Sequence, residues 1–324
     1  NIIYLGALTY LLGIEQELVE ALLADEYASK PALVGANIEA MHIGFSHART
    51  HLQPLGLQLS RADAVGDRIF VDGNTAAALG AVYGGATVCA WYPITPSTSL
   101  AEAFTDYCGK LRHDPETKEA RYAIVQAEDE IASIGIVVGA GWNGSRAFTC
   151  TSGPGVSLMQ EFIGLSYFAE IPAVIFDVQR GGPSTGMPTR TQQSDILSAA
   201  YASHGDTKHV LLLPEGPGEC FEMGAQAFDL ADRLQTMVFV MLDLDMGMNE
   251  WLVDPFQWDD SRSLDHGKVM TAEMLEADTD FGRYKDVDGD GIPFRTLPAT
   301  HPSRGAYFTR GTSRDPYARY SEEG

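Results

Sequence analysis

The spacing of hydrophobic and polar residues changes along the chain. Residues 2–12, 15–28 and 33–48 carry helical patterns, whereas residues 51–66 have no sustained period and contain Pro54 and Gly56. Three short helices are too few to enclose a core of their own. We therefore expect residues 1–50 to be the C-terminal part of a preceding domain, followed by a linker over residues 51–67.

From residue 68 to residue 246, short apolar runs alternate with helical patterns. The runs predicted as strands are residues 68–71, 86–90, 122–125, 146–151, 173–178, 209–213 and 237–244. Continuously hydrophobic strands separated by helices favour a mostly parallel sheet with helices on both faces. The sequence thus predicts one α/β domain over residues 68–246.

Residues 247–324 are rich in Asp, Gly, Pro, Arg and aromatic residues, with a weak helical pattern at 272–277. So long an irregular segment is expected to wrap a partner subunit or to lead into a further domain. Within it, Asp286, Asp288 and Asp290 are spaced as in the first half of a calcium loop, but the twelfth position is Leu297 instead of glutamate. We interpret these residues as a tight acidic turn and leave metal binding open.

Composition excludes several classes of partner and cofactor. The formal net charge of -22 argues against nucleic acid or an anionic membrane as the main partner. The four cysteines, Cys89, Cys108, Cys150 and Cys220, lie far apart and form no Cys-x-x-Cys pair, so we expect neither an iron–sulfur cluster nor a zinc site in this chain. Free thiols and the lack of a leader or a spanning apolar run favour a cytoplasmic location. Because the chain begins at Asn1 inside a helical pattern, we expect it to be a fragment or a processed chain.

One turn is the strongest candidate for a functional site. Residues 91–99 join a predicted strand to a helix, and Pro93 and Pro96 stiffen the turn, so that Thr95 is held extended at the carboxyl end of a strand. Ser99 and Glu102 have the spacing of a capping box, which predicts that the helix begins at Ser99. The alternative is a rigid connector without function.

Two further loops follow strands in the same sense, at residues 152–155 and 179–182. In a parallel sheet all three loops meet at one edge, where ligands bind. Arg180, followed by glycines, suits bidentate capture of a carboxylate; the alternative is a structural ion pair. The sequence therefore places a candidate anion site at this edge.

Acidic residues precede the apolar helix that follows the strand at 122–125. Glu128, Asp129 and Glu130 can simply favour a helix N-terminus. Glu130, however, directly adjoins Ile131, and a carboxyl group in such surroundings would have a raised pKa and could share a proton. On the residues alone, favourable charge at a helix N-terminus is the preferred interpretation.

Two other patterns carry no site. Residues 139–144 have the G-x-G-x-x-G spelling of a dinucleotide loop, but they follow a helix and precede a strand, the reverse of what pyrophosphate binding requires. No histidine sits beside a candidate nucleophile, so we predict no hydrolase triad.

Taken together, several motifs resemble the alpha subunit of 2-oxoacid:ferredoxin oxidoreductases, and most closely the 2-oxoglutarate type with a gamma domain fused in front. The motifs are residues 72–77, Tyr92-Pro93-Ile94-Thr95-Pro96-Ser97, residues 126–130, residues 151–155 and residues 179–186. Residues 1–50 resemble the end of the gamma domain. Residues 293–315 resemble a stretch that leads to the next domain. The departure from the family is truncation at both ends.

The resemblance implies a pyrimidine-binding thiamine diphosphate domain. The beta subunit would hold the diphosphate and Mg²⁺ and carry the iron–sulfur cluster. Glu130 corresponds to the glutamate that exchanges a proton with the aminopyrimidine ring, with Glu128 as the alternative if the register differs. Pro93, Ile94, Ser152 and Gly153 correspond to positions that line the cofactor.

The resemblance also implies the substrate contacts. Thr95 corresponds to the threonine that touches the 2-oxoacid, and Arg180 to the arginine that holds its carboxylate. We expect the loop at residues 179–194 to close over the pocket, with Arg190, beside Thr189, Thr191 and Gln192, recognising the far carboxylate of 2-oxoglutarate; the alternative is a surface arginine.

The expected reaction is oxidative decarboxylation of 2-oxoglutarate to succinyl-CoA, with electrons passed to ferredoxin, as in a TCA cycle of anaerobic metabolism. It would need a beta subunit, in a hetero-oligomer such as a dimer of alpha–beta pairs. The alternatives are the same chemistry on pyruvate or branched-chain 2-oxoacids, and a non-catalytic assembly subunit of such a complex.

Overall fold

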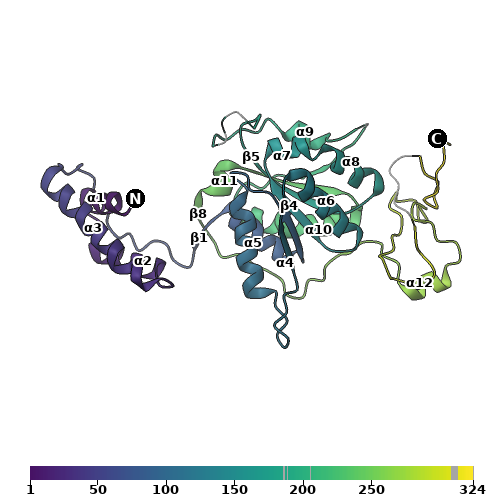
Figure 1. Ribbon diagram of the computed structural model, residues 1–324, viewed down its shortest axis with the longest axis horizontal. Helices are drawn as coiled ribbons and strands as arrows, with labels where there is room; N and C mark the ends of the chain where they lie inside the picture. Colours follow the sequence, from purple (N-terminus) through teal and green to yellow (C-terminus); the bar gives the residue numbers. More distant parts are fainter. Residues whose placement is uncertain (185–186, 188, 205, 308–312, 324) are drawn as a thin grey trace. The chain divides into compact units, whose positions relative to one another are not determined.

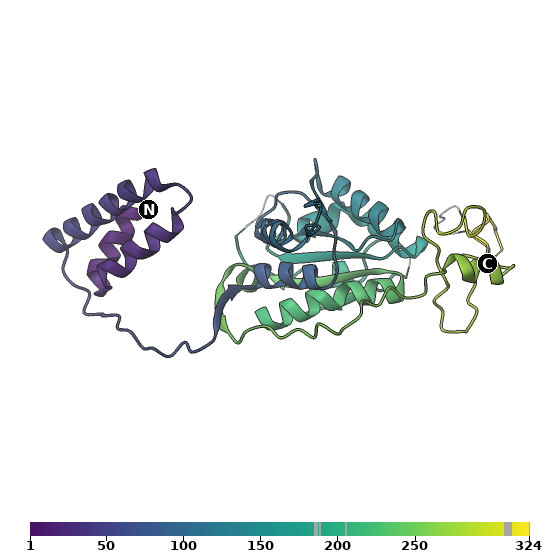
Figure 2. The same ribbon diagram turned by 90° about the horizontal axis from the view of Figure 1, so that it is seen from below.

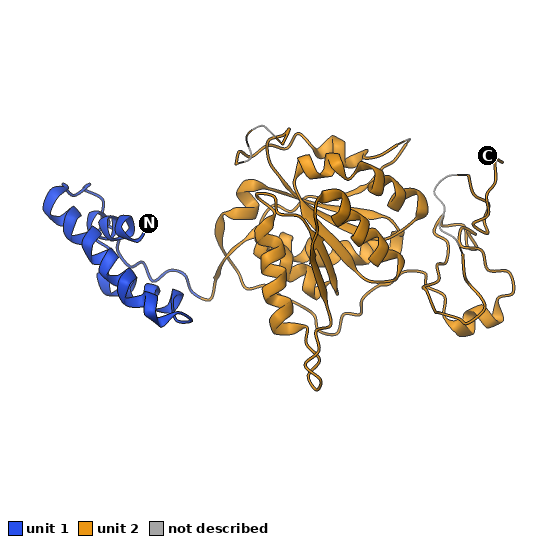
Figure 3. Cartoon of the chain, in the orientation of Figure 1, with its two compact units in different colours: residues 1–66 blue, residues 67–324 orange. Residues whose placement is uncertain are grey.

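The computed structural model describes residues 1–184, 187, 189–204, 206–307 and 313–323, which form two compact units, residues 1–66 and 67–324 (Figure 3). The first unit contains the helices α1 (Ile2–Leu12), α2 (Gln16–Glu26) and α3 (Pro31–His51). Gly6 and Gly44 let α1 and α3 pack closely, since a Cβ atom on Gly6 would lie 1.9 Å from the Met41 carbonyl oxygen. The boundary between the units falls within the expected linker.

The second unit is built on a parallel sheet. Its six strands lie in the order β3-β2-β4-β5-β7-β6, and each neighbouring pair is parallel. The bounds are β2 (Val88–Trp91), β3 (Ala123–Gln126), β4 (Ala147–Thr151), β5 (Ala173–Gln179), β6 (Val210–Leu212) and β7 (Met237–Asp243). The predicted α/β class with a mostly parallel sheet is confirmed.

Helices cover both faces of this sheet (Figures 1 and 2). One face carries α4 (Gly73–Tyr83), α5 (Thr98–Leu111) and α10 (Pro217–Leu234) over buried phenylalanines of β4 and β5. The other carries α6 (Glu130–Trp142), α7 (Gly153–Leu158), α8 (Gln160–Ala169) and α9 (Ile196–Ala200). Because both faces are covered, the central strands are apolar on both sides, and this is why their sequences read as continuous hydrophobic runs.

One predicted strand lies outside the main sheet. β1 (Ile69–Asp72) pairs in antiparallel fashion with β8 (Glu250–Val253), which the sequence did not predict, and α11 (Leu244–Met248) connects β7 to β8. β1 is only partly buried, unlike the central strands. The expectation that residues 68–71 open the parallel series is therefore wrong, because their partner is a strand near the far end of the domain.

The C-terminal segment contains α12 (Ala272–Ala277), as the sequence predicted, and is otherwise irregular. It is tied to the sheet domain through Glu170. The nearly inaccessible side chain of Arg283 donates to the carboxylate and to the carbonyl of Glu170, and Arg314 donates to the same carboxylate at 2.7 Å. Residues 308–312 of the stretch expected to lead to a further domain lie outside the described residues. No helix in the described part of the chain has the length and apolar character needed to span a bilayer.

Candidate active site

The residues predicted to carry chemistry follow four neighbouring strands. Thr95 comes after β2, Glu130 after β3, Ser152 after β4 and Arg180 after β5. Since these strands are parallel, the four positions lie at the same edge of the sheet. The chain passes from β2 outward to β3 and then returns to the other side of β2 with β4, which creates the kind of switch point where open α/β sheets bind ligands.

The turn that carries Thr95 is fixed by hydrogen bonds within the turn and by one from α4. The Ile94 amide donates to Thr98 Oγ1 at 3.1 Å, and Ser97 Oγ donates to the Ile94 carbonyl at 3.0 Å. Asn74, at the start of α4, donates from Nδ2 to the Pro96 carbonyl at 2.8 Å. The bond between Thr95 and Pro96 is cis. Thr95 itself is exposed at the end of this braced turn.

The predicted capping box is not present. α5 begins at Thr98 with Ser97 as its N-cap, so Ser99 lies inside the helix. Ser99 Oγ instead accepts a hydrogen bond from Asn74 Nδ2 at 2.8 Å. The prediction was wrong because a side chain 25 positions earlier in the chain competes for this hydroxyl group, which no local spacing reveals.

Arg180 reaches from the end of β5 to the turn after β2. Its Nη1 atom donates to the Thr95 carbonyl at 3.0 Å, and the residue is 7% exposed. Burial lowers the pKa of the guanidinium group, while the charge of Glu130 acts in the opposite direction. Its Nε atom is buried and has no hydrogen-bond partner among the described residues. One donor group of this arginine thus remains available.

Glu130 opens α6 and is 8% exposed. Asp129 caps the helix by accepting the Ala132 amide at 2.7 Å, so the carboxyl group of Glu130 is not needed for capping. A Cβ atom on Gly155 would lie 3.0 Å from Glu130 Cγ and 1.9 Å from Thr151 Oγ1, so only glycine fits beside this carboxylate. Glu128, the alternative candidate, is exposed. Burial therefore favours Glu130 of the two.

The other predicted cofactor contacts differ in their surroundings. Ser152 is buried, and its Oγ atom has no partner among the described residues. Gly153 is half-buried and belongs to a pocket of about 290 Å³ that Arg180 also lines. Pro93 is exposed and Ile94 half-buried.

The predicted substrate loop is joined at its base. The Gly181 amide donates to the Arg190 carbonyl at 2.9 Å, which brings these two positions of the loop together. The side chains of Arg190, Thr189, Thr191 and Gln192 are exposed. Residues 185, 186 and 188 of this loop lie outside the described residues, so the structure shows the base of the loop.

Sequence reasoning missed two acids at the same edge. Asp177 lies in β5 and is fully buried, and Asp195 precedes α9 and is also buried. Gln179 Nε2 donates to Asp195 Oδ1. The signal was present, because an aspartate within the apolar run of residues 173–178 is unusual in a central strand.

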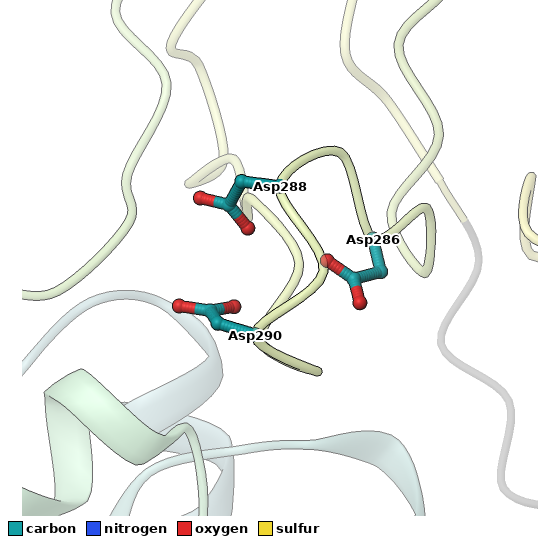
Figure 4. A group of neighbouring side chains, drawn as sticks. All are labelled: Asp286, Asp288 and Asp290. Carbon is teal, nitrogen blue, oxygen red and sulfur yellow. The ribbon is translucent and has the colours of Figure 1, made fainter.

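The acidic turn of the C-terminal segment is occupied by a side chain. Figure 4 shows the three carboxylates of Asp286, Asp288 and Asp290 grouped around one loop. Lys268 Nζ lies 2.7 Å from oxygens of both Asp288 and Asp290 and 2.9 Å from the Ile292 carbonyl. A single ammonium group therefore already bonds to two of the three carboxylates, which supports the interpretation as an acidic turn.

Comparison with known proteins assigns the sheet domain to a family. Residues 79–280 match the family described as pyruvate flavodoxin/ferredoxin oxidoreductase, thiamine diphosphate-binding. The chain belongs to this family. The matched region contains Thr95, Glu130, Ser152 and Arg180, and the family description gives the sheet domain as a thiamine diphosphate-binding fold.

Members of the family with curated names extend the comparison. The chain is 33% identical over 332 residues to 2-oxoacid:ferredoxin oxidoreductase 2, subunit alpha, of Aeropyrum pernix, covering 100% of this chain and 50% of the relative. It is 45% identical over 174 residues to 2-oxoglutarate synthase subunit KorA of Methanocaldococcus jannaschii, covering 54% of this chain and 45% of the relative. The chain thus spans about half the length of these relatives.

A solved structure resembles the whole chain. It is the 2-oxoglutarate:ferredoxin oxidoreductase from Magnetococcus marinus with 2-oxoglutarate, coenzyme A and succinyl-CoA bound. The TM-score is 0.78 at 29% identity, and the match covers 99% of this chain and 53% of that one. The predicted family resemblance is confirmed.

Proposed function

We propose that this chain is the catalytic alpha subunit of a 2-oxoacid:ferredoxin oxidoreductase that converts 2-oxoglutarate, with loss of CO₂, to succinyl-CoA. The observation that carries the proposal is the meeting of Arg180, Thr95 and Glu130 at one edge of the sheet. An arginine with a free donor, a braced turn and a buried carboxyl group supply what a 2-oxoacid and a thiamine ring require.

The residues present fit the pyrimidine half of thiamine diphosphate. A carboxyl group that exchanges a proton with the ring must be shielded from water, and Glu130 is buried beside Gly155, where no side chain fits. The hydroxyl group of Ser152 is buried without a partner among the described residues and could bond to a polar atom of the ring. When bound, the cofactor supplies a nucleophilic carbon and an electron sink for decarboxylation.

This chain's own residues then bind and orient the substrate. Arg180 holds the carboxylate next to the keto group through its unused donor, while its bond to the Thr95 carbonyl fixes the guanidinium plane. Thr95 is exposed on the same turn and can place its hydroxyl group against the substrate. Glu130 holds and returns the proton of the pyrimidine ring.

We assign the second carboxylate of 2-oxoglutarate to Arg190. Its main chain is bonded to Gly181, the residue after Arg180, and its side chain is exposed toward solvent. Relatives named for 2-oxoglutarate support this choice of substrate over pyruvate or a branched-chain 2-oxoacid.

The proposal includes a beta subunit that holds Mg²⁺, the diphosphate and an iron–sulfur cluster, in a hetero-oligomer such as a dimer of alpha–beta pairs. All four cysteines of this chain are buried and free, and burial raises the pKa values of Cys108 to about 11 and Cys150 to about 12. Such thiols are poor metal ligands, which supports placing the cluster in the partner. Ferredoxin is the proposed acceptor, coenzyme A the acyl acceptor, and the cytoplasm the proposed location.

The test is reduction of ferredoxin or methyl viologen by the full-length protein purified with its partner subunit. We expect activity that needs both thiamine diphosphate and coenzyme A and prefers 2-oxoglutarate to pyruvate. A preference for pyruvate or a branched-chain 2-oxoacid would retain the chemistry but overturn the substrate. No activity in a complex with its cluster and cofactor loaded would favour an assembly subunit.

A further inference from the structure

The α6–α9 face of the sheet changes from apolar to polar at its carboxyl edge. Along β5, Ile175 lies in the apolar cluster of this face, and Asp177 and Gln179 follow at the next two positions with the same orientation. In β4, Thr151 is the register partner of Asp177. All of these side chains are buried, so the polar groups must bond among themselves.

These groups have more hydrogen-bond acceptors than donors. Both carboxylate oxygens of Asp177 and Oδ2 of Asp195 have no donor among the described residues. Yet Asp195 accepts a hydrogen bond from Gln179, which lies two positions after Asp177 on the same side of β5, and Asp177 is 0% exposed. A hydrogen bond with Asp195 is also among the causes that raise the pKa of Asp177. Two ionised carboxylates could not remain in contact without water, whereas one proton between them supplies the missing donor.

Few charges surround the pair. α7 and α9 contain no ionisable side chain, and β4 contains only the thiol of Cys150, which belongs to the apolar cluster of the opposite face. On the other packed elements, α6 contributes Glu130, which faces Arg180; α8 contributes the exposed Glu161; and β7 ends at Asp243, whose carboxylate caps α11 at 2.7 Å. The pKa of Asp177 is raised well above its usual range, first by burial and then by Asp195.

The pair also joins the two ends of the substrate loop. Asp195 follows the loop, and its Oδ1 atom accepts from Gln179, the neighbour of Arg180. Its Oδ2 atom lies against Gly153, only 2.4 Å from where a Cβ atom would be. Asp195 therefore contacts the strand end that carries Arg180 and also the loop after β4.

We propose that Asp177 and Asp195 share one proton, with Asp177 donating to the Asp195 carboxylate, and that this buried pair positions Arg180 by holding the base of the loop against the end of β5. Asp177 and Asp195 are positioning residues, since they act through Gln179 and Arg180 and do not touch substrate. The shared proton is inferred from the structure alone. The effect of the pair on substrate binding rests on the proposed function.

Infrared spectroscopy of the purified full-length protein tests the shared proton directly. We expect a C=O stretch of a protonated carboxyl group at neutral pH that shifts in D₂O and disappears in Asp177→Asn, in which an amide N–H replaces the acidic proton. Asp206→Asn, which removes an exposed carboxyl group, should leave the band unchanged. The shared proton is ruled out if the wild-type protein shows no such band or if Asp177→Asn retains it.

Steady-state kinetics of the active complex test the positioning role. Asp177→Ala removes the donor, so the KM for the 2-oxoacid should rise about tenfold, the equivalent of one hydrogen bond, with kcat little changed. Asp177→Asn should keep the KM near the wild-type value and remove any rise of KM at alkaline pH. Equal KM values in the alanine and asparagine variants would overturn the positioning role. A carboxyl band in a protein without 2-oxoacid activity would instead refute the proposed function and leave the proton pair standing.

Discussion

Arg180 Nη1 donates a hydrogen bond of 3.0 Å to the main-chain carbonyl of Thr95, 85 residues earlier in the chain. This bond joins the loops after β5 and β2 and leaves Nε of the same guanidinium group without a partner among the described residues. A structural ion pair, the alternative interpretation of Arg180, would have its charge compensated by an acid. Here the hydrogen bond goes to a neutral carbonyl. Burial lowers the pKa of the guanidinium group, and the nearby charge of Glu130 raises it without forming a salt bridge among the described residues.

Replacing this arginine tests that role. Arg180→Lys keeps the charge but loses the fork of donors, so it cannot bond to the Thr95 carbonyl and to a carboxylate in the same geometry. We expect kcat/KM for 2-oxoglutarate to fall about 10- to 100-fold, the usual effect of losing a charge-assisted hydrogen bond. The assay is viologen reduction over a range of substrate concentrations. An unchanged kcat/KM would show that Arg180 is only structural.

Glutamine variants distinguish the two glutamates before α6. Glu130→Gln keeps the shape of the side chain but cannot exchange a proton, so kcat should fall about 100- to 10,000-fold. Glu128→Gln should have a small effect, since Glu128 is exposed. Cofactor binding, followed by calorimetry, shows whether the lost activity comes from lost affinity. If Glu128→Gln is the inactive variant, the catalytic role passes to that residue.

Arg190 is expected to determine the choice of substrate. Arg190→Met removes the charge that would bind the second carboxylate of 2-oxoglutarate, so the KM for this substrate should rise by at least about tenfold. The KM for 2-oxobutyrate, which has no second carboxylate, should change little. Similar changes for both substrates, measured in parallel, would reduce Arg190 to a surface residue.

The raised pKa of Asp177 makes stability depend on pH. The unfolded chain releases this proton near pH 4, while the folded protein retains it to higher pH. Between the two pKa values the folded state binds more protons, so the contribution of Asp177 to the free energy of unfolding falls as pH rises, by about 1.4 kcal/mol per pH unit. Chemical denaturation of wild type and Asp177→Asn should show a difference that changes with pH. A constant difference would mean that Asp177 does not retain its proton.

A buried ion-pair network holds the start of β4. The Arg146 side chain is 2% exposed and bonds to Asp229 at 2.8 Å and to Asp232 at 2.9 Å. Arg146→Met leaves both acids with one cation fewer in a buried site, and we expect a loss of about 3–5 kcal/mol in the free energy of unfolding. Arg121→Met breaks the exposed pair with Asp114 and should change stability little. Urea denaturation compares the two variants, and equal effects would contradict this account.

The sequence by itself determined the fold class and the edge of the site. Continuous apolar runs separated by helical patterns can be buried only in a parallel sheet covered on both faces, and that topology places Thr95 and Arg180 at one edge. The family motifs around these residues predicted the thiamine diphosphate-binding domain. Such signals are local, because hydrophobic period and turn chemistry depend on neighbours in the chain.

Tertiary structure decided what depends on distant partners. β1 lies outside the main sheet because its partner, β8, comes some 180 residues later. The hydroxyl group of Ser99, inside α5, accepts a hydrogen bond from Asn74, 25 residues earlier in the chain. Gln179 at the end of β5 bonds to Asp195 because the loop between them returns to this strand. Hydrogen bonds and burial depend on which residues are close in space. A chain folded into layers brings together residues that are far apart in sequence, and the local sequence does not predict these contacts.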